Sequence, residues 1–113
     1  MTATAVERGQ VHWVALDPVR GSEIAKTRPC VILSANEINS RRKTVVIVPL
    51  TSTPQTASFP LLVAVPSAGV NSKVRPDQIR CIDKTRLLGV MGCVSDGDLN
   101  LIADAVSKVL GLH

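Results

Sequence analysis

The sequence has very few aromatic residues and no long hydrophobic run. Trp13 and Phe59 are its only aromatic side chains, and tyrosine is absent. The core must therefore consist of valine, isoleucine and leucine, and stacking of bases on aromatic side chains cannot be the main route to nucleic acid. No apolar stretch approaches the length that spans a membrane, and residues 1–10 lack the apolar segment of a signal peptide. These absences favour a cytoplasmic protein that does not interact with a membrane.

Metal ligands and the common nucleophile motifs are missing as well. The chain has no G-x-S-x-G, no P-loop and no CxxC, and its only histidines are His12 and His113. No His, Cys, Asp or Glu cluster has the spacing of metal ligands, so we expect neither a catalytic metal nor another cofactor. Cys30 and Cys81 lie in apolar runs, and we expect the cysteines to be buried and reduced. His12, on a predicted strand, is a weak candidate for a general base.

Length and composition limit the architecture. With 113 residues, we expect a single domain over residues 1–113, near the size at which oligomerisation helps stability. Hydrophobic residues make up 45% and charged residues 19%, a balance typical of ordered globular proteins. We expect residues 1–7 to form a flexible tail.

Positive charge is in excess and unevenly distributed. The net charge is +4; residues 94–113 carry three aspartates against one lysine, so the rest of the chain carries +6. Arginine outnumbers lysine eight to five, which favours bidentate phosphate contacts. One stretch with a net charge of +3 can follow a nucleic-acid backbone; its basic residues are Lys73, Arg75, Arg80, Lys84 and Arg86. A solvated basic surface explains the charge equally well.

Short apolar runs predict five or six β-strands. They are Val11–Leu16, Arg28–Ser34, Thr44–Leu50, Pro60–Val65, Val74–Ile82 and Leu88–Val94. The third run is rich in β-branched residues and is predicted to be buried on both faces, with Pro49 marking either its end or an edge position. Residues 36–43 are expected to form a loop or a short helical turn, and residues 51–58 a polar loop.

The C-terminal segment has helical periodicity. Ser95, with Asp98 three residues later, is a plausible helix start, and Gly111 ends the pattern. The apolar arc covers about half of this helix. Burial against both the domain and a partner subunit explains so wide an arc, and a short helix packed into its own domain explains it equally well. Several strands and one terminal helix predict a mainly β protein with a small SH3-like barrel.

Two groups of polar residues stand at strand ends. The first is Arg28 with Lys26 and Glu23, and the second is Thr51 with Ser52. If the second and third strands are antiparallel neighbours, Arg28 and Thr51 lie at the same end of the sheet. A guanidinium and a hydroxyl can hold a phosphate and stabilise a phosphorane. Pairing of Arg28 with Glu23, and capping of a turn by Thr51, remain open alternatives.

These residues and their order resemble the MazF/PemK toxin family of type II toxin–antitoxin systems, which also includes Kid. The resemblance covers roughly residues 8–112. The matching segments are RGQV at 8–11 with Trp13, DP at 17–18, GSE at 21–23, RP at 28–29 with the strand after it, VPLTS at 48–52, DQIR at 77–80, IDK at 82–84 and RL at 86–87. The series GSE, K-x-RP, PLTS and DQIR in this order makes the resemblance strong.

The resemblance implies an SH3-like barrel with a C-terminal helix, assembled as a homodimer. Members of the family are metal-independent endoribonucleases that cut single-stranded RNA at short sequences. The 2′-hydroxyl attacks the adjacent phosphate and leaves a 2′,3′-cyclic phosphate and a 5′-hydroxyl. An antitoxin inhibits the enzyme by laying an acidic segment across the RNA groove.

By the family's motif, Arg28 and Thr51 are the catalytic residues. The expected RNA-binding residues are Glu23, Lys26, Ser52, Asp77, Gln78 and Arg80. A guanidinium with a pKa above ~12 is a poor general base at neutral pH, so we assign Arg28 to electrostatic stabilisation of the phosphorane. The base is left open between Glu23, His12 and water.

Two alternative functions stay open, and one segment departs from the family's pattern. CcdB-like gyrase poisons share the architecture and act by protein contact, but they have no use for the pair of Arg28 and Thr51. A homologue that binds RNA without cleaving it is a further alternative. Ala15 and Leu16 stand where some relatives have an acidic and an aromatic residue, so we expect base recognition to differ at these positions.

Overall fold

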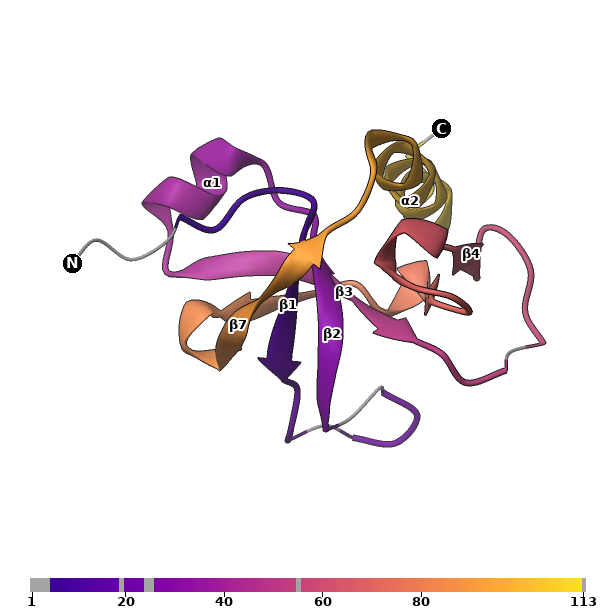
Figure 1. Ribbon diagram of the computed structural model, residues 1–113, viewed down its shortest axis with the longest axis horizontal. Helices are drawn as coiled ribbons and strands as arrows, with labels where there is room; N and C mark the ends of the chain where they lie inside the picture. The colour runs from indigo at the N-terminus through magenta and orange to yellow at the C-terminus, as the bar shows by residue number, and fades with distance from the viewer. Residues whose placement is uncertain (1–4, 19, 24–25, 55, 113) are drawn as a thin grey trace.

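The computed structural model describes residues 5–18, 20–23, 26–54 and 56–112 (Figure 1). Within these ranges the strands are β1 (Gln10–Ala15), β2 (Thr27–Ile32), β3 (Thr44–Thr51), β4 (Val63–Ala64), β5 (Lys73–Val74), β6 (Arg80–Asp83) and β7 (Leu87–Cys93). The helices are α1 (Asn36–Arg41) and α2 (Asp96–Val109), and the 3-10 turns are η1 (Pro66–Ala68), η2 (Pro76–Gln78) and η3 (Lys84–Arg86). None of these helices has the length and apolar content needed to cross a membrane.

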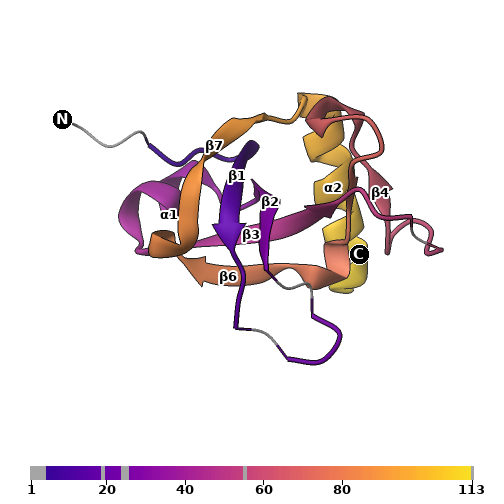
Figure 2. The ribbon, with the colours of Figure 1, turned by 60° about the horizontal axis from the view of Figure 1, so that its bottom comes forward.

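All the strand pairs are antiparallel, and the sheet bends into an open barrel. Its order is β4-β5-β3-β2-β1-β7, and β6 pairs with the first half of β3. In Figure 2 the strands curve from β7 at the top, through β1 and β2, to β3 and β6 at the bottom. The predicted class, mainly β with a C-terminal helix, is therefore confirmed. Helices α1 and α2 lie toward opposite ends of the long strand β3 in both views.

Strand β3 organises the sheet because it pairs with three other strands. One edge follows β2, while the other pairs with β6 through Thr44–Ile47 and with β5 through Leu50 and Thr51. Pro49 lies between these two pairings, where the second edge has no strand partner, as expected for a proline at a local edge. The strand continues beyond Pro49 to Thr51, so Thr51 belongs to the sheet and not to the predicted loop.

Two apolar clusters fill the molecule on opposite faces of the sheet. The first cluster lies under α2, which contributes Ile102, Ala105 and Val106; its other buried members are Val11, Val31, Leu33, Val48, Leu50, Val63, Val65, Val74 and Val94. The second cluster lies inside the curve of the barrel and consists of Val14, Leu16, Cys30, Ile32, Val45, Ile47 and Ile82. Neither contains an aromatic residue, as the composition requires.

Helix α2 starts as predicted, since the Ser95 hydroxyl accepts a hydrogen bond from the Asp98 N–H at 3.2 Å. One stripe of the helix is buried in the first cluster. Leu101 and Leu110 of the same helix are exposed on this single chain. The domain therefore covers only part of the apolar face of α2, and the rest of that face is exposed.

Two of the predicted strands are wrong in extent. Val74–Ile82 is divided into β5 and β6 by η2, because Pro76 has no N–H for a ladder and starts a 3-10 turn. Only Val63 and Ala64 of the segment Pro60–Val65 are extended in the sheet.

Two of the cysteines and part of the N-terminal segment also differ from what the sequence predicted. Cys30 is fully buried, as predicted, but Cys81 and Cys93 are exposed. Cys81 lies on β6 opposite Val46, so an apolar neighbourhood in sequence did not make it a core residue. Residues 1–4 of the predicted tail lie outside the described residues. Val6 packs against the second cluster, and the Glu7 N–H donates to Gln10 Oε1.

Candidate nucleic-acid interface

Arg28 and Thr51 lie at the same end of the sheet. Strands β2 and β3 are antiparallel neighbours with Ile32 opposite Ile47 and Cys30 opposite Pro49. The same register, continued by two residues, places Arg28 opposite Thr51. The predicted proximity of Arg28 and Thr51 depended on antiparallel pairing of these two strands, and the structure has this pairing.

A second guanidinium, that of Arg80, belongs to the same face. Burial raises the pKa of the Cys30 thiol to about 12, while the nearby positive charges of Arg80 and Arg28 act in the opposite direction. Both guanidiniums are therefore close enough to the Cys30 sulfur to influence it. Arg80 is also opposite Ile47 of the second cluster, which places it on the face that carries Cys30.

Thr51 is nearly buried, with 8% of the residue exposed. Its Oγ1 accepts a hydrogen bond from the Thr53 N–H at 3.2 Å, so the side chain shapes the end of the strand. Its hydroxyl proton remains available for donation to a ligand. Capping of a turn and a contact to phosphate are thus compatible roles for this residue. Ser52 follows directly and is exposed.

The loop between β1 and β2 carries Glu23 and Lys26. The Leu16 N–H donates to the Lys26 carbonyl at 2.9 Å, and the Lys26 N–H donates to Asp17 Oδ1 at 2.9 Å. These two bonds close the base of the loop, and Lys26 adopts a positive φ of 69° there. Within the loop, Glu23 Oε1 accepts from the Arg20 N–H at 2.7 Å.

Two arginines that are distant in sequence, Arg80 and Arg86, bind the chain at the start of this loop. Arg86 Nη1 donates to the carbonyls of Ala15 and Asp17 at 2.9 and 2.6 Å, and Arg80 Nη1 donates to the carbonyl of Leu16 at 3.3 Å. The sequence left open whether these residues follow a nucleic-acid backbone or belong to a solvated basic surface. The structure shows that the Arg86 guanidinium holds the chain that leads into the loop, a role that no local pattern signals.

Asp77 and Gln78 belong to η2, which packs against α2 and β3. This turn connects β5, opposite Thr51, with β6, which starts opposite Ile47. It therefore lies along the stretch of β3 that includes Pro49. Asp77 is held by Arg75, with the Nε and Oδ1 atoms 3.4 Å apart. The sheet and the turn thus bring Asp77, Gln78, Arg80 and Thr51 to one part of the molecule.

This arrangement coincides with a match to a known family. The family model of the PemK-like, MazF-like toxin of type II toxin–antitoxin systems matches residues 7–110. The chain belongs to this toxin family. The match includes both strands that carry Arg28 and Thr51 and the turn that carries Asp77 and Gln78.

Individual relatives agree with the family match. The chain is 34% identical over 115 residues to "Endoribonuclease MazF9" of Mycobacterium tuberculosis, with 95% of this chain and 98% of the relative covered. It is 31% identical over 112 residues to "Endoribonuclease MazF" of Staphylococcus saprophyticus, with 96% and 93% covered. A solved structure, "Endoribonuclease in complex with its cognate antitoxin from Mycobacterial species", has a TM-score of 0.80 at 31% identity and covers 96% of this chain and 98% of its own. These relatives do not favour the gyrase-poison alternative.

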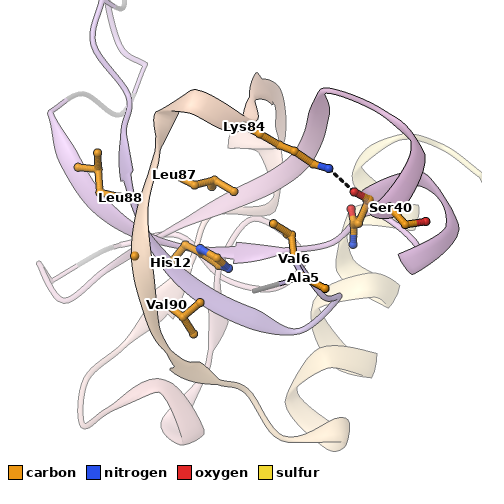
Figure 3. Close-up of a pocket in the computed structure, with 10 residues that line it drawn as sticks. Ala5, Val6, His12, Ser40, Lys84, Leu87, Leu88 and Val90 are labelled. Carbon is orange, nitrogen blue, oxygen red and sulfur yellow. Dashed lines mark hydrogen bonds between the residues drawn. The ribbon is translucent and has the colours of Figure 1, made fainter. Parts of the chain in front are cut away.

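A cavity of about 690 Å³ in this toxin-family member is lined by neither Arg28 nor Thr51. Figure 3 shows His12 in its wall with Val6, Leu87 and Val90 around the ring. Lys84 and Asn39 also line this cavity, and Lys84 Nζ donates to the Asn39 carbonyl. Among the residues that the structure describes, no group of three or more His, Cys, Asp or Glu side chains is arranged to hold a metal ion.

His12 is a buried, neutral side chain. Only 4% of the residue is exposed, and burial lowers its pKa. Gln10 Oε1, which already accepts from the Glu7 N–H, lies 2.9 Å from His12 Nε2, so Nε2 carries the proton and donates to it. Nδ1 is then an acceptor, and it is buried without a partner among the described residues. Its burial and its bond to Gln10 make His12 a poor candidate for the general base.

Substitution of His12 tests this assignment through stability. Because the folded-state pKa lies below the ordinary value, the unfolded chain takes up the proton first as the pH falls. The free energy of unfolding of the wild type should therefore decrease as the pH falls below about 6.5. We expect His12→Leu to reduce this loss of unfolding free energy at acidic pH and to leave RNA cleavage at neutral pH unchanged. Urea unfolding at pH 7.5 and 5.5 measures the effect; an equal pH dependence in both proteins contradicts it.

Leu16, which stands where some relatives have an aromatic residue, is not available to RNA. Its side chain is fully buried in the second cluster, although the neighbouring loop is exposed. A leucine buried in this way cannot contact a base, and the expectation that base recognition differs here stays a prediction.

Proposed function

We propose that the chain is the toxin of a type II toxin–antitoxin system and acts as an endoribonuclease on single-stranded RNA. The observation that carries the proposal is that Arg28 and Thr51 lie at one end of the sheet, with Arg80 on the same face opposite Ile47. Two arginines and a hydroxyl there suit a phosphate that gains negative charge during reaction. The named relatives, both endoribonucleases, support the same reaction class.

The reaction that this site suits is an internal transfer of the phosphate. The 2′-oxygen attacks the adjacent phosphorus and gives up its proton, and the bond from phosphorus to the 5′-oxygen breaks. The 5′-oxygen takes up a proton, so the products are a 2′,3′-cyclic phosphate and a 5′-hydroxyl. The reaction needs no metal, because the charge of the phosphorane is met by fixed cations and a hydroxyl.

In this proposal, Arg28 and Thr51 are the catalytic residues. The guanidinium of Arg28 binds two phosphate oxygens, and the Thr51 hydroxyl donates to one of them. Arg28 remains protonated and stabilises charge instead of moving protons. Glu23 or a water molecule takes the proton from the 2′-hydroxyl, because His12 is buried and its Nε2 is bonded to Gln10 Oε1.

The remaining residues line the path of the RNA. Glu23 and Lys26 border it from the loop, Ser52 from the end of β3, and η2 and β6 from the other side. An exposed, positively charged path with few aromatic residues favours contacts to the backbone and to base edges over stacking. The RNA-binding residues are thus Glu23, Lys26, Ser52, Asp77, Gln78 and Arg80.

The proposed protein partners are a second copy of the chain and an acidic antitoxin, both in the cytoplasm. Strand β7 is an edge strand whose residues from Leu88 onward are exposed and uncharged, and Leu110 of α2 is exposed as well. Such an apolar surface supports a homodimer. The charge of +6 on residues 1–93 supports an acidic partner, and one solved relative is a complex with its cognate antitoxin.

Mapping of RNA ends in the presence of EDTA tests this function. The purified protein should cut single-stranded RNA without added metal, and adapters should join to the new 5′ ends only after phosphorylation by a kinase. The downstream 5′-hydroxyl and the upstream cyclic phosphate follow from attack by the 2′-oxygen. The same mapping gives the recognised bases.

A duplex of the same sequence is the matched substrate control. It should resist cleavage, because a helix holds the 2′-oxygen away from the line of attack. A strict requirement for a divalent metal contradicts the mechanism. Salt-dependent RNA binding without new ends instead favours the non-cleaving homologue.

A further inference from the structure

We propose that Lys73 is a third cationic residue of the active site and contacts the phosphate held between Arg28 and Thr51. This inference rests on the proposed function, since it adds a group to the same reaction centre. The sequence shows Lys73 only as one member of a basic stretch. The pairing of β5 with β3 distinguishes Lys73 from the other basic residues of that stretch, because it places Lys73 opposite Thr51.

The register of β3 and β5 places Lys73 beside Thr51. Thr51 is directly opposite Lys73 in this antiparallel pair, and Leu50 is opposite Val74. Side chains that are directly opposite share a face of the sheet, with Cβ atoms about 4.5–5.5 Å apart. Arg28 occupies the corresponding place on the other side of Thr51, so the three residues form a row across β2, β3 and β5.

The burial of the neighbouring residue agrees with this orientation. Val74 is fully buried in the first cluster, together with Leu50 opposite it. Since successive side chains of a strand point to opposite faces, Lys73 points away from the first cluster. The face it shares continues through Thr51 to Ile47 and the second cluster, where Arg80 also lies.

The ammonium group is held where it can act. Lys73 is half-buried, and its Nζ donates to the carbonyl of Asn71 at 2.9 Å. An ammonium has three donors, so two remain for phosphate oxygens. Neither of the two ion pairs found among the described residues, Arg75–Asp77 and Lys108–Asp104, includes Lys73. A fixed cation of this kind stabilises developing charge with little reorganisation.

A general basic surface is the competing explanation, and Lys43 provides the matched control for it. Lys43 is exposed and immediately precedes β3, whereas Thr51 is the last residue of that strand. Eight residues of extended chain separate the two ends by about 26 Å. A substitution at Lys43 changes the net charge by the same amount but lies far from the proposed phosphate.

The experiment compares Lys73→Met, Lys73→Arg and Lys43→Met with the wild type. Each protein is present in excess over an RNA oligonucleotide with the mapped cleavage site, in EDTA, and the rate is measured as protein concentration increases. We expect Lys73→Met to lower the saturating rate about 10- to 100-fold. Lys73→Arg keeps the charge and should stay within about tenfold of wild type, and Lys43→Met should not lower the saturating rate. Thermal unfolding checks that each variant is folded.

The outcomes separate this inference from the proposed function. If the wild type cuts the RNA and Lys73→Met reaches the same saturating rate as Lys43→Met, Lys73 has no part in catalysis. If Lys73→Met changes only the protein concentration needed for half-saturation, the inference is also overturned. Such a result means that the ammonium contacts the bound RNA and not the phosphorane. A slow Lys73→Met rescued by Lys73→Arg supports it. If the wild type makes no cut, the proposed function fails and this inference fails with it.

Discussion

Arg28→Ala should lower the rate of RNA cleavage by at least about 100- to 1,000-fold, the loss typical when one fixed donor to a developing oxyanion is removed. Arg28 is paired through its backbone with Val14 of β1, and its charge is felt at the buried Cys30 thiol. The backbone that carries this guanidinium therefore belongs to the sheet and not to the exposed loop. An arginine fixed in this way needs little reorganisation when the phosphorane forms.

Two further variants show whether geometry or charge is responsible. Arg28→Lys keeps a positive charge but loses the planar fork, so we expect an intermediate rate. Arg41→Ala removes the same charge at the end of α1 and should not lower the rate at saturating RNA. The rate is measured by gel analysis of a labelled oligonucleotide, with circular dichroism to confirm folding. Equal rates for Arg28→Ala and Arg41→Ala would remove Arg28 from the site.

The sequence predicted the elements that depend on local chemistry. The start of α2 followed from Ser95 and Asp98, and the strands near residues 11, 28, 44 and 88 followed from their apolar runs. The proximity of Arg28 and Thr51 followed from a single assumption, that two consecutive strands are antiparallel. Each of these predictions uses information contained in a few neighbouring residues or in the order of adjacent strands.

The features that the sequence did not predict depend on contacts between distant parts of the chain. Arg86 reaches the carbonyl of Asp17 across 69 positions in the sequence, and no local pattern signals such a bond. Leu16 directly precedes the exposed loop, yet it is a core residue because the barrel closes over it. Cys81 has apolar neighbours but faces outward. Lys73 resembled any other surface lysine until the pairing of β5 with β3 placed it opposite Thr51.

Thr51→Val is expected to have the next largest effect on catalysis. Valine has nearly the shape of threonine but lacks the hydroxyl, so the phosphate loses one donor and the rate should fall about 100-fold. The substitution also removes the acceptor for the Thr53 N–H. Thr53 is exposed, so water can replace that bond, and the stability should fall by no more than about 1 kcal/mol.

Thr51→Ser separates the hydroxyl from the methyl group. Serine keeps both the donor and the acceptor for Thr53, so its cleavage rate should remain within about tenfold of wild type despite the methyl group lost from a nearly buried position. Single-turnover cleavage gives the rates, and urea unfolding at the same pH gives the stabilities. A slow Thr51→Val with wild-type stability assigns the loss to the phosphate contact. A Thr51→Ser variant as slow as Thr51→Val would mean that packing at the end of β3, and not the hydroxyl, positions the phosphate beside Arg28.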